Sequence, residues 1–383
     1  MTPSPEGLHL SGFFAVRQTN YGGRACFAQR NISRGTIILE SKEPVGCTVC
    51  YDFRKEVCHR CFHYEGGNTM KFKLSAEDLQ AFVIKIYPSG KEMETLLKKG
   101  SFLGAGLWFC SDLCRRDFLT LRDVSVLLIS FEKLLRLFQS QNKARAAQKS
   151  EETGADPIAA DINKHIEQRW SQIETEWIPR LSKLKDTRQQ MEAPILTEEE
   201  YISVRFVIDT LWRIRADNLK KELCTRNQAF ECLQSNEISK IRRAPSLLMS
   251  QIKIFQTLYI ILPFELKSFL TSTLFRHIIG ADYANSFGIW ELGLQSDARE
   301  LLGYWMIPEA SFFNHSCAPN VDKRRIGNTL HFVTNKDINA NEQLCIDYSG
   351  ILDLDVKERQ KSFSENWFFN CTCDRCSLEL KAV

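Results

Sequence analysis

The spacing of the cysteines near the C-terminus constrains this chain more than any other feature. Cys371, Cys373 and Cys376 form a Cys-x-Cys-x-x-Cys run, and a fourth thiol, Cys317, stands far upstream. Three clustered thiols and one distant thiol are enough to close a tetrahedral zinc site. We therefore predict a structural zinc site made by these four residues, which ties the loop around Cys317 to the C-terminal segment.

Six further cysteines form three pairs at ligand-like spacing: Cys47/Cys50, Cys58/Cys61 and Cys110/Cys114. Ten of the fourteen cysteines thus stand in such spacings, and the sequence shows no secretory signal, so metal sites are favoured over disulfides. The other four are predicted to be small buried apolar residues: Cys26, Cys224, Cys232 and Cys345.

Length and composition set broad limits on the class of protein. A chain of 383 residues accommodates two or three folded units, and 44% hydrophobic with 25% charged residues is ordinary for a soluble protein. The net charge of +3 is far below that of a dedicated nucleic-acid binder, so direct nucleic-acid binding is not expected. Basic runs at 240–243 and 323–325 are interpreted as solvated faces. The sequence contains no run of eighteen apolar residues, the length that a membrane-spanning helix requires, so we expect a cytoplasmic or nuclear protein.

Periodicity and turn residues predict the secondary structure. Short strands are expected at 13–16, 25–28 and 36–40, separated by Gly-containing turns. Apolar residues recur at helical intervals over 118–138, 158–184, 198–223 and 245–270. The insertion at 71–106 is expected to form a small subdomain, and the polar stretch 139–156 a flexible excursion.

Polar residues gather around Cys317. Asn314 and His315 follow an apolar run, and Tyr348 closes a short apolar strand before the cysteine run at the C-terminus. An Asn-His core, a following tyrosine and a Cys-x-Cys-x-x-Cys tail, in that order, resemble the catalytic half of a SET-domain protein methyltransferase.

This resemblance implies the chemistry. It implies S-adenosylmethionine as the methyl donor and the side-chain amine of a protein lysine, histone or non-histone, as the acceptor. Tyr348 matches the catalytic tyrosine, which would orient the amine and the methyl group through its hydroxyl. Asn314 and His315 match the cofactor-binding loop. Asn285, in an Asn-Ser-Phe segment, matches the cofactor-binding asparagine of the SET-and-MYND subgroup.

Other candidate cofactor contacts lie outside this core. Gly23 and Arg24 stand in a strand-Gly-Gly-Arg-strand segment that resembles the N-terminal cofactor-binding segment of the family. Phe368 and Phe369, just before Cys371, are placed to cover the adenine ring or to wall the lysine channel. Asn341 replaces the glycine of a Gly-Glu-Glu-Leu turn, and asparagine tolerates the left-handed conformation that such a turn requires.

The segment Trp108 to Cys114 resembles the third ligand pair of a MYND zinc finger. The interleaved pairing of that finger implies one zinc held by Cys47, Cys50, Cys110 and Cys114. The expected fourth pair is absent, so Cys58 and Cys61 lack partners unless His59 or His63 contributes. A rival pairing joins Cys47/Cys50 with Cys58/Cys61 and leaves out the Cys110 pair. The finger is degenerate in either case, and two zinc ions per chain are predicted.

The predicted fold class is α+β: a β-rich SET fold interrupted by a MYND-like zinc finger and helical insertions, with a post-SET zinc knuckle. The expected division is 11–46 for the N-terminal SET strands, 47–118 for the finger, 119–280 for the helical region, 281–350 for the catalytic core and 351–383 for the knuckle. We expect a monomer with a protein substrate. Seven residues follow Cys376, where many SET-and-MYND proteins continue into a helical repeat domain, so a substrate groove built by such a domain is expected to be lacking.

A second interpretation belongs to a different class. The chain would keep the fold without turnover and act as an interaction module, with the finger recruiting a proline-rich peptide. Asn285, Asn314, His315 and Tyr348 favour catalysis, and the degenerate finger counts against a dedicated adaptor.

Overall fold

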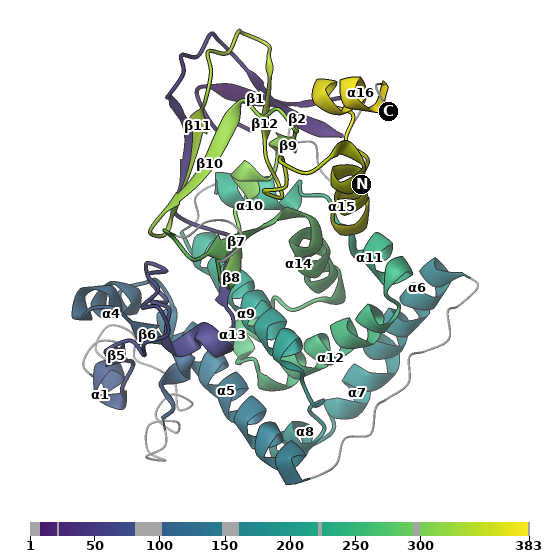
Figure 1. Ribbon diagram of the computed structural model, residues 1–383. Helices are drawn as coiled ribbons and strands as arrows, with labels where there is room; N and C mark the ends of the chain where they lie inside the picture. Colours follow the sequence, from purple (N-terminus) through teal and green to yellow (C-terminus); the bar gives the residue numbers. More distant parts are fainter. Residues whose placement is uncertain are drawn as a thin grey trace.

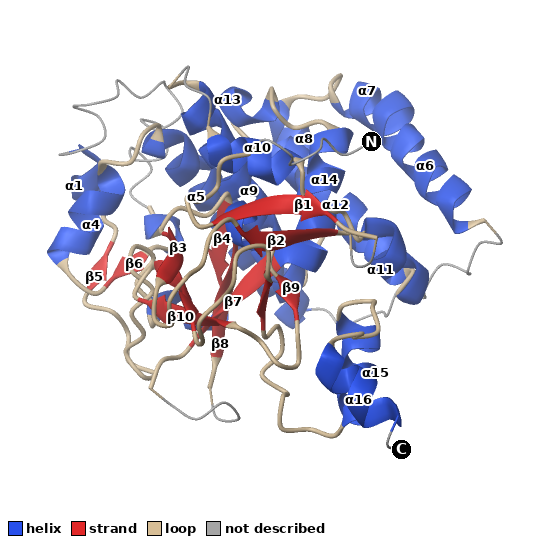
Figure 2. Cartoon of the chain, turned by 90° about the horizontal axis from the view of Figure 1, so that it is seen from above, coloured by secondary structure: helices blue, strands red, loops and turns tan. Residues whose placement is uncertain are grey.

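The structure is a computed structural model and describes residues 8–20, 23–80, 102–147, 161–220, 224–293 and 299–381. A β-rich part lies above a helical part (Figure 1). Seen from above, the strands occupy the middle of the molecule, with helices around them (Figure 2). This arrangement of mixed strands and helices confirms the α+β class.

The β-rich part consists of small sheets rather than one large sheet. Their strand orders are β1-β2-β12-β9, β10-β11-β3, β4-β8-β7 and β5-β6. The strands are β1 Phe14–Gln18, β2 Arg24–Ala28, β3 Ile37–Ser41, β4 Gly46–Val49, β5 Phe72–Lys73, β6 Trp108–Phe109, β7 Ser286–Trp290, β8 Leu301–Met306, β9 Asn314–His315, β10 Val321–Ile326, β11 Thr329–Thr334 and β12 Gln343–Ile346. The three strands expected at the N-terminus are confirmed as β1, β2 and β3.

An aromatic core joins the first two sheets directly beneath the Asn-His motif. Phe313 is buried, and its ring stacks on Phe332 of β11 with 4.9 Å between the ring centroids. Phe14 of β1 packs against the Phe313 ring, with 5.0 Å between the two ring centroids. Because Phe313 immediately precedes Asn314, this packing fixes the point at which the motif emerges from the core.

The helical part matches the expected periodic segments. Its main helices are α5 Val124–Ala147, α6 Ile162–Gln172, α7 Ile178–Leu181, α8 Asp186–Met191, α9 Glu198–Asn218, α10 Thr225–Glu231, α11 Glu237–Arg243, α12 Ser246–Ile261, α13 Phe264–Lys267 and α14 Ser272–Asn285. A π-helix, Ile173–Trp177, joins α6 to α7. Two short helices belong to the finger region, α1 Ala76–Asp78 and α4 Asp112–Leu119. Two more lie at the C-terminal end, α15 Val356–Asn366 and α16 Asp374–Lys381.

Helix α9 is the centre of the helical part. Thr197 and Glu200 form a capping box at its start, which satisfies backbone N–H groups that the helix itself cannot pair. The helix packs against β4, α5 and α12, so it connects the two parts of the molecule.

The flexible segment predicted for 139–156 is wrong over 139–147, because α5 continues to Ala147. Residues 148–160 lie outside the described residues, as do Gly22 of the glycine pair and 81–101 of the insertion. Within the described part of the chain, no helix has the length and hydrophobicity needed to cross a membrane.

The close approach of β4 to β8 generates a stability prediction. A Cβ at Gly303 would lie 2.2 Å from the carbonyl oxygen of Thr48. We expect Gly303→Ala to lower the free energy of unfolding by about 1–3 kcal/mol, because the two strands must separate. Urea denaturation in the presence of zinc measures this change. Gly12→Ala is the matched control, since nothing lies within 4 Å of its added methyl. Equal midpoints for the two variants would contradict the packing described.

Candidate functional site

Cys317, Cys371, Cys373 and Cys376 form one compact group of sulfur atoms. All four sulfurs lie within 4.8 Å of one another. The Sγ of Cys317 is 3.4 Å from that of Cys376 and 4.0 Å from that of Cys371. A zinc ion with Zn–S bonds of about 2.3 Å in a tetrahedron requires sulfurs about 3.8 Å apart. The group therefore fits the zinc ion predicted from the spacing.

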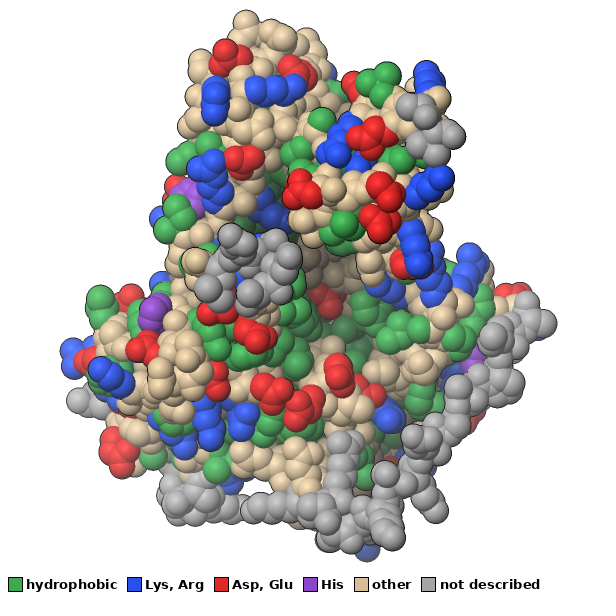
Figure 3. Space-filling view, in the orientation of Figure 1, with side chains coloured by type: hydrophobic (Ala, Val, Ile, Leu, Met, Phe, Trp, Pro, Cys, Tyr) green, Lys and Arg blue, Asp and Glu red, His purple; other side chains and the backbone are tan. Residues whose placement is uncertain are grey.

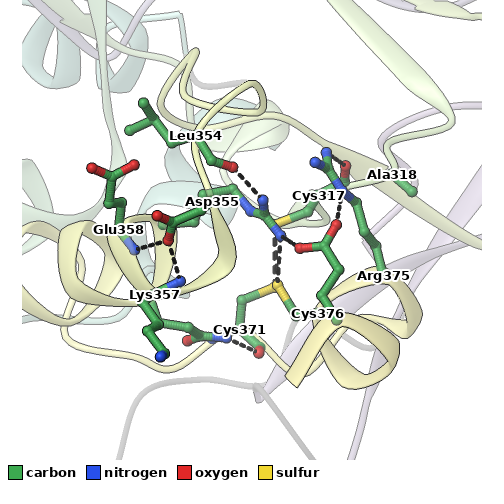
Figure 4. A network of polar contacts seen from close by, with 12 residues as sticks. Cys317, Ala318, Leu354, Asp355, Lys357, Glu358, Cys371, Arg375 and Cys376 are labelled. Atoms are coloured by element: carbon green, nitrogen blue, oxygen red, sulfur yellow. Dashed lines mark hydrogen bonds and ion pairs between the residues drawn. The ribbon is translucent and has the colours of Figure 1, made fainter. Parts of the chain in front are cut away.

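A buried arginine that the sequence analysis missed supports this group. Arg359 of α15 has no exposed surface, and its guanidinium donates to the Cys376 sulfur at 3.7 Å. It also donates to the Leu354 carbonyl and pairs with Glu379 of α16, both at 2.5 Å. Figure 4 shows the surrounding polar contacts of the knuckle, in which Arg375 donates to the Cys317 carbonyl at 3.2 Å. A cation beside zinc-binding thiolates offsets their negative charge.

The finger thiols group differently from the predicted pairing. Cys58, Cys61, Cys110 and Cys114 form the second group, with all sulfurs within 4.8 Å of one another. The Cys110 sulfur is 3.6 Å from that of Cys61 and 3.7 Å from that of Cys114. This spacing again fits tetrahedral zinc.

Backbone pairing explains why Cys58 and Cys61, rather than Cys47 and Cys50, face the third pair. The amide of His59 donates to the Trp108 carbonyl at 3.0 Å, and Phe72 pairs with Phe109 between β5 and β6. These contacts place the Cys58 loop against the start of the Cys110 segment, with α4 closing the group. Both pairings considered from the sequence, each of which used Cys47 and Cys50, are therefore wrong.

Cys47 has a different environment. It lies on β4 against α9, where its amide donates to the Asp209 carboxylate at 2.9 Å and Arg213 donates to its sulfur at 3.7 Å. Burial, together with the neighbouring Asp209, raises the pKa of Cys47 to about 12, so the thiol stays protonated. Cys50 follows β4, and its amide donates to the Leu302 carbonyl at 2.9 Å. Neither residue belongs to a metal-sized group within the described part of the chain.

The two histidines of the finger do not join its sulfurs. His63 is exposed and pairs with Glu65 at 2.9 Å. His59 is partly buried, and its Nδ1 lies 3.2 Å from the Trp108 carbonyl oxygen. Burial lowers the pKa of His59 to about 3, so it is neutral. The alternative in which a histidine completes the finger site is therefore not seen among the described residues, and four cysteines complete the group.

His315 connects the C-terminal sulfur group to Tyr348. Its Nε2 lies 3.4 Å from the Cys317 sulfur, and its Nδ1 accepts a hydrogen bond from the Tyr348 amide at 3.2 Å. Because Nδ1 accepts, the proton of the neutral ring is on Nε2, where it points at the sulfur. Burial lowers the pKa of His315 to about 4, which keeps the ring neutral at physiological pH.

Tyr348 lies just beyond β12 among aromatic rings. Its hydroxyl donates to the Phe313 carbonyl at 2.8 Å. Ring centroids of His315, Trp367 and Phe369 lie 5.5, 6.3 and 6.3 Å from its own. Burial raises the pKa of Tyr348 well above its usual value, so the hydroxyl stays protonated and acts as a hydrogen-bonding group rather than as a base.

Strand pairing brings the N-terminal candidates to the same place. β12 pairs with β2 on one side and, in parallel, with β9 on the other, with Ile346 opposite His315. Arg24 at the start of β2 therefore lies at the end of the sheet where His315 and Tyr348 lie. Gly23 adopts φ +75°, a left-handed conformation that suits glycine.

A loop that the sequence analysis missed joins Arg24 to Asn285. Arg24 donates to the Cys232 carbonyl, and its guanidinium lies over the Phe312 ring at 5.2 Å. Asn285 ends α14, and its side chain donates to the Gln234 carbonyl at 3.1 Å. The segment 232–234 thus contacts both candidates, and no motif distinguished it in the sequence.

The two phenylalanines before Cys371 take opposite directions. Phe369 stacks on Phe363 at 5.3 Å and lies 6.2 Å from His315. Phe368 adopts φ +65° and turns to α11, where Arg243 lies over its ring at 4.2 Å and Lys240 at 5.1 Å. Phe369 therefore stays a candidate for the cofactor pocket. Phe368 does not share that position, and the basic run 240–243 holds it instead of forming only a solvated face.

Comparisons with known proteins agree with this geometry. The SET domain family matches residues 23–349. The chain belongs to the SET domain family. A potential protein lysine methyltransferase, SET6, of Saccharomyces cerevisiae is 43% identical over the full length of both chains. A histone-lysine N-methyltransferase, ASHR2, of Arabidopsis thaliana is 32% identical over 31% of this chain and 30% of its own. A SET and MYND domain-containing protein of Dictyostelium discoideum is 34% identical over 28% of this chain and 26% of its own.

The protein is thus an S-adenosylmethionine-dependent protein lysine methyltransferase with a SET-and-MYND-like organisation and zinc-binding cysteine groups. The residues present fit the cofactor. Aromatic rings surround Tyr348. Asn314 and the backbone of His315 lie beside it on β9, and Arg24 of β2 and Asn285 of α14 both donate to carbonyls of the 232–234 loop. The individual cofactor contacts of these residues stay predictions.

The regrouping of the finger thiols gives a direct test by zinc analysis. We expect two zinc ions per wild-type chain, one ion in Cys58→Ser, one in Cys317→Ser, and two in Cys47→Ser, because Cys47 lies against α9. Elemental analysis of the purified proteins measures the content. Loss of an ion from Cys47→Ser would contradict the grouping.

The role of Arg359 is tested by zinc retention. Arg359→Met removes the positive charge beside the Cys376 sulfur, so we expect the C-terminal site to lose about 10–100-fold in zinc affinity. Competition with a coloured chelator measures both sites in one sample, and the finger site serves as the internal control. Unchanged release from the C-terminal site would show that the arginine only packs α15.

Proposed function

We propose that Tyr348 is the catalytic residue and that the acceptor lysine reaches it through the hollow between the β-rich part and the helices, which is visible in Figure 3. This proposal is based mainly on the position of Tyr348. Its hydroxyl donates a hydrogen bond to the Phe313 carbonyl, and the residue lies among aromatic side chains next to the Asn314–His315 strand.

When bound, S-adenosylmethionine supplies a methyl group on a cationic sulfur. Arg24, Asn285, Asn314 and the His315 backbone would bind its polar ends, and Phe369 would cover its adenine ring. The support for these roles is that one end of the β1-β2-β12-β9 sheet and the 232–234 loop gather the residues.

The acceptor amine must be neutral to attack, and its free pKa of about 10.4 makes deprotonation at pH 7 cost ~4–5 kcal/mol. Aromatic walls at Tyr348 and Trp367 would lower that pKa by desolvation. The Tyr348 hydroxyl would then hold the amine in line with the methyl group, which is a positioning effect.

We also propose that the enzyme is a monomer located in the cytoplasm or the nucleus. The charge balance of +3 supports the absence of direct nucleic-acid binding. Because the Arabidopsis relative is a histone-lysine N-methyltransferase, histone tails are one group of substrates to assay, beside fractionated cell protein.

Tyr348→Phe tests the catalytic role. We expect methyl transfer to fall by about 10²-fold or more, because the hydroxyl that aligns the amine is lost. Binding of S-adenosylmethionine, measured by calorimetry, should survive, since the ring and its neighbours remain. Transfer to fractionated cell protein with labelled cofactor measures the first quantity. Activity equal to that of the wild type would remove Tyr348 from the reaction.

A further inference from the structure

Lys323 is exposed, as expected for the basic run 323–325, but its amine also contacts neighbouring segments of the fold. Side chains alternate along β10, so Arg324 points away from Lys323 and pairs with Asp322 at 2.7 Å on the exposed side. Lys323 and Arg325 turn toward β7 instead. Arg325 donates to the Trp290 carbonyl, at the end of that strand. Lys323 and Arg324 are thus exposed as expected, whereas Arg325 is half-buried.

The Lys323 ammonium is held by weak contacts. Its Nζ lies 3.5 Å from the Asp347 carbonyl oxygen and 5.3 Å from the centroid of the Phe287 ring. No carboxylate of the described residues lies within ion-pair distance of it, although the charge of Asp347 is near enough to act on it. A carbonyl and an aromatic face bind an ammonium without fixing it as a salt bridge does.

These contacts place the amine next to two segments that carry residues of the functional site. Asp347 immediately precedes Tyr348, and Phe287 belongs to the Asn285-Ser286-Phe287 segment. The positive charge of Lys323 also acts on His315, the ring that holds the Tyr348 amide. The side chain keeps contact with solvent, so its amine is accessible rather than sealed.

Proton release from this amine is favoured locally. Desolvation by the surrounding chain lowers the pKa of Lys323, and the charge of Asp347 opposes this effect. Of the other charged or titratable groups near it, His315 is neutral and Arg325 on its own strand is a cation.

We propose that Lys323 is an internal methyl acceptor: its amine takes the position of a substrate lysine beside Tyr348 and is methylated by the active site of its own chain. The neutral amine forms an N–CH3 bond while the S–CH3 bond of S-adenosylmethionine breaks. The sulfur keeps the electron pair as a neutral thioether, and the nitrogen becomes a methylammonium cation, its one lost proton having gone to solvent before the attack. The product keeps its positive charge but has a larger head group. This proposal depends on Tyr348 being the catalytic residue.

The first experiment detects the modification. Purified, zinc-loaded protein is incubated with labelled S-adenosylmethionine and no other acceptor, and peptides are analysed by mass spectrometry. We expect methyl groups on Lys323, loss of this label in Lys323→Arg, and its retention in the control Lys336→Arg, whose lysine pairs with Glu342 at 3.2 Å.

The second experiment establishes transfer within one chain. Tyr348→Phe as acceptor is mixed with Lys323→Arg as enzyme, and we expect no label on Lys323. Label appearing there would overturn transfer within the chain. The rate in the wild type should be independent of protein concentration.

A third measurement needs no cofactor. Limited acetylation of the apoprotein at pH 8 should modify Lys323 readily, because an acceptor amine must be reachable and neutral. Lys323 left unacetylated while Lys336 is fully modified would overturn the proposal. The proposal would also be overturned if Lys323 carried no methyl label in a preparation that binds S-adenosylmethionine and methylates cell protein in a Tyr348-dependent manner. Failure of both binding and all transfer would instead count against the function proposed for Tyr348.

Discussion

The hydrogen bonds of His315 are the interaction on which the rest of the site depends. One ring nitrogen contacts the Cys317 sulfur and the other accepts from the Tyr348 amide. The imidazole is buried and neutral, so each nitrogen has one fixed role. A zinc ion in the C-terminal group would therefore position the tyrosine through a single ring. This explains how a metal that takes no part in methyl transfer can still be necessary for it.

The fold supplies the other constraints on that ring. Phe313 fixes the emergence of β9 from the core by stacking on Phe332, and β12 then brings Tyr348 alongside in parallel. On the far side, Phe363 lies 4.2 Å from the His315 ring centroid, and it belongs to the same helix as Arg359. Helix α15 thus contacts both the sulfur group and the imidazole, which makes the C-terminal knuckle part of the pocket wall.

The sequence predicted much of this site because local spacing carries it. The Cys-x-Cys-x-x-Cys run, the Asn-His motif and Tyr348 are each recognisable over a few residues, and Asn341 takes the left-handed conformation expected of it, with φ +65°. Long-range contacts were not predictable in this way. Arg359 and the 232–234 loop act through tertiary neighbours, and the finger pairing was wrong because backbone pairing between His59 and Trp108 decides it. The division of the chain at 46, 118, 280 and 350 stays a prediction.

The C-terminal sulfur group, through His315 and α15, holds the residues of the predicted cofactor pocket together. The direct measurement is calorimetric binding of S-adenosylmethionine to Cys376→Ser, which removes one sulfur of the C-terminal group, with Cys114→Ser of the finger as the control. Far-UV circular dichroism establishes that both variants are folded. We predict that Cys376→Ser binds the cofactor at least about tenfold more weakly while Cys114→Ser binds like the wild type. Wild-type affinity in zinc-depleted Cys376→Ser would contradict the account.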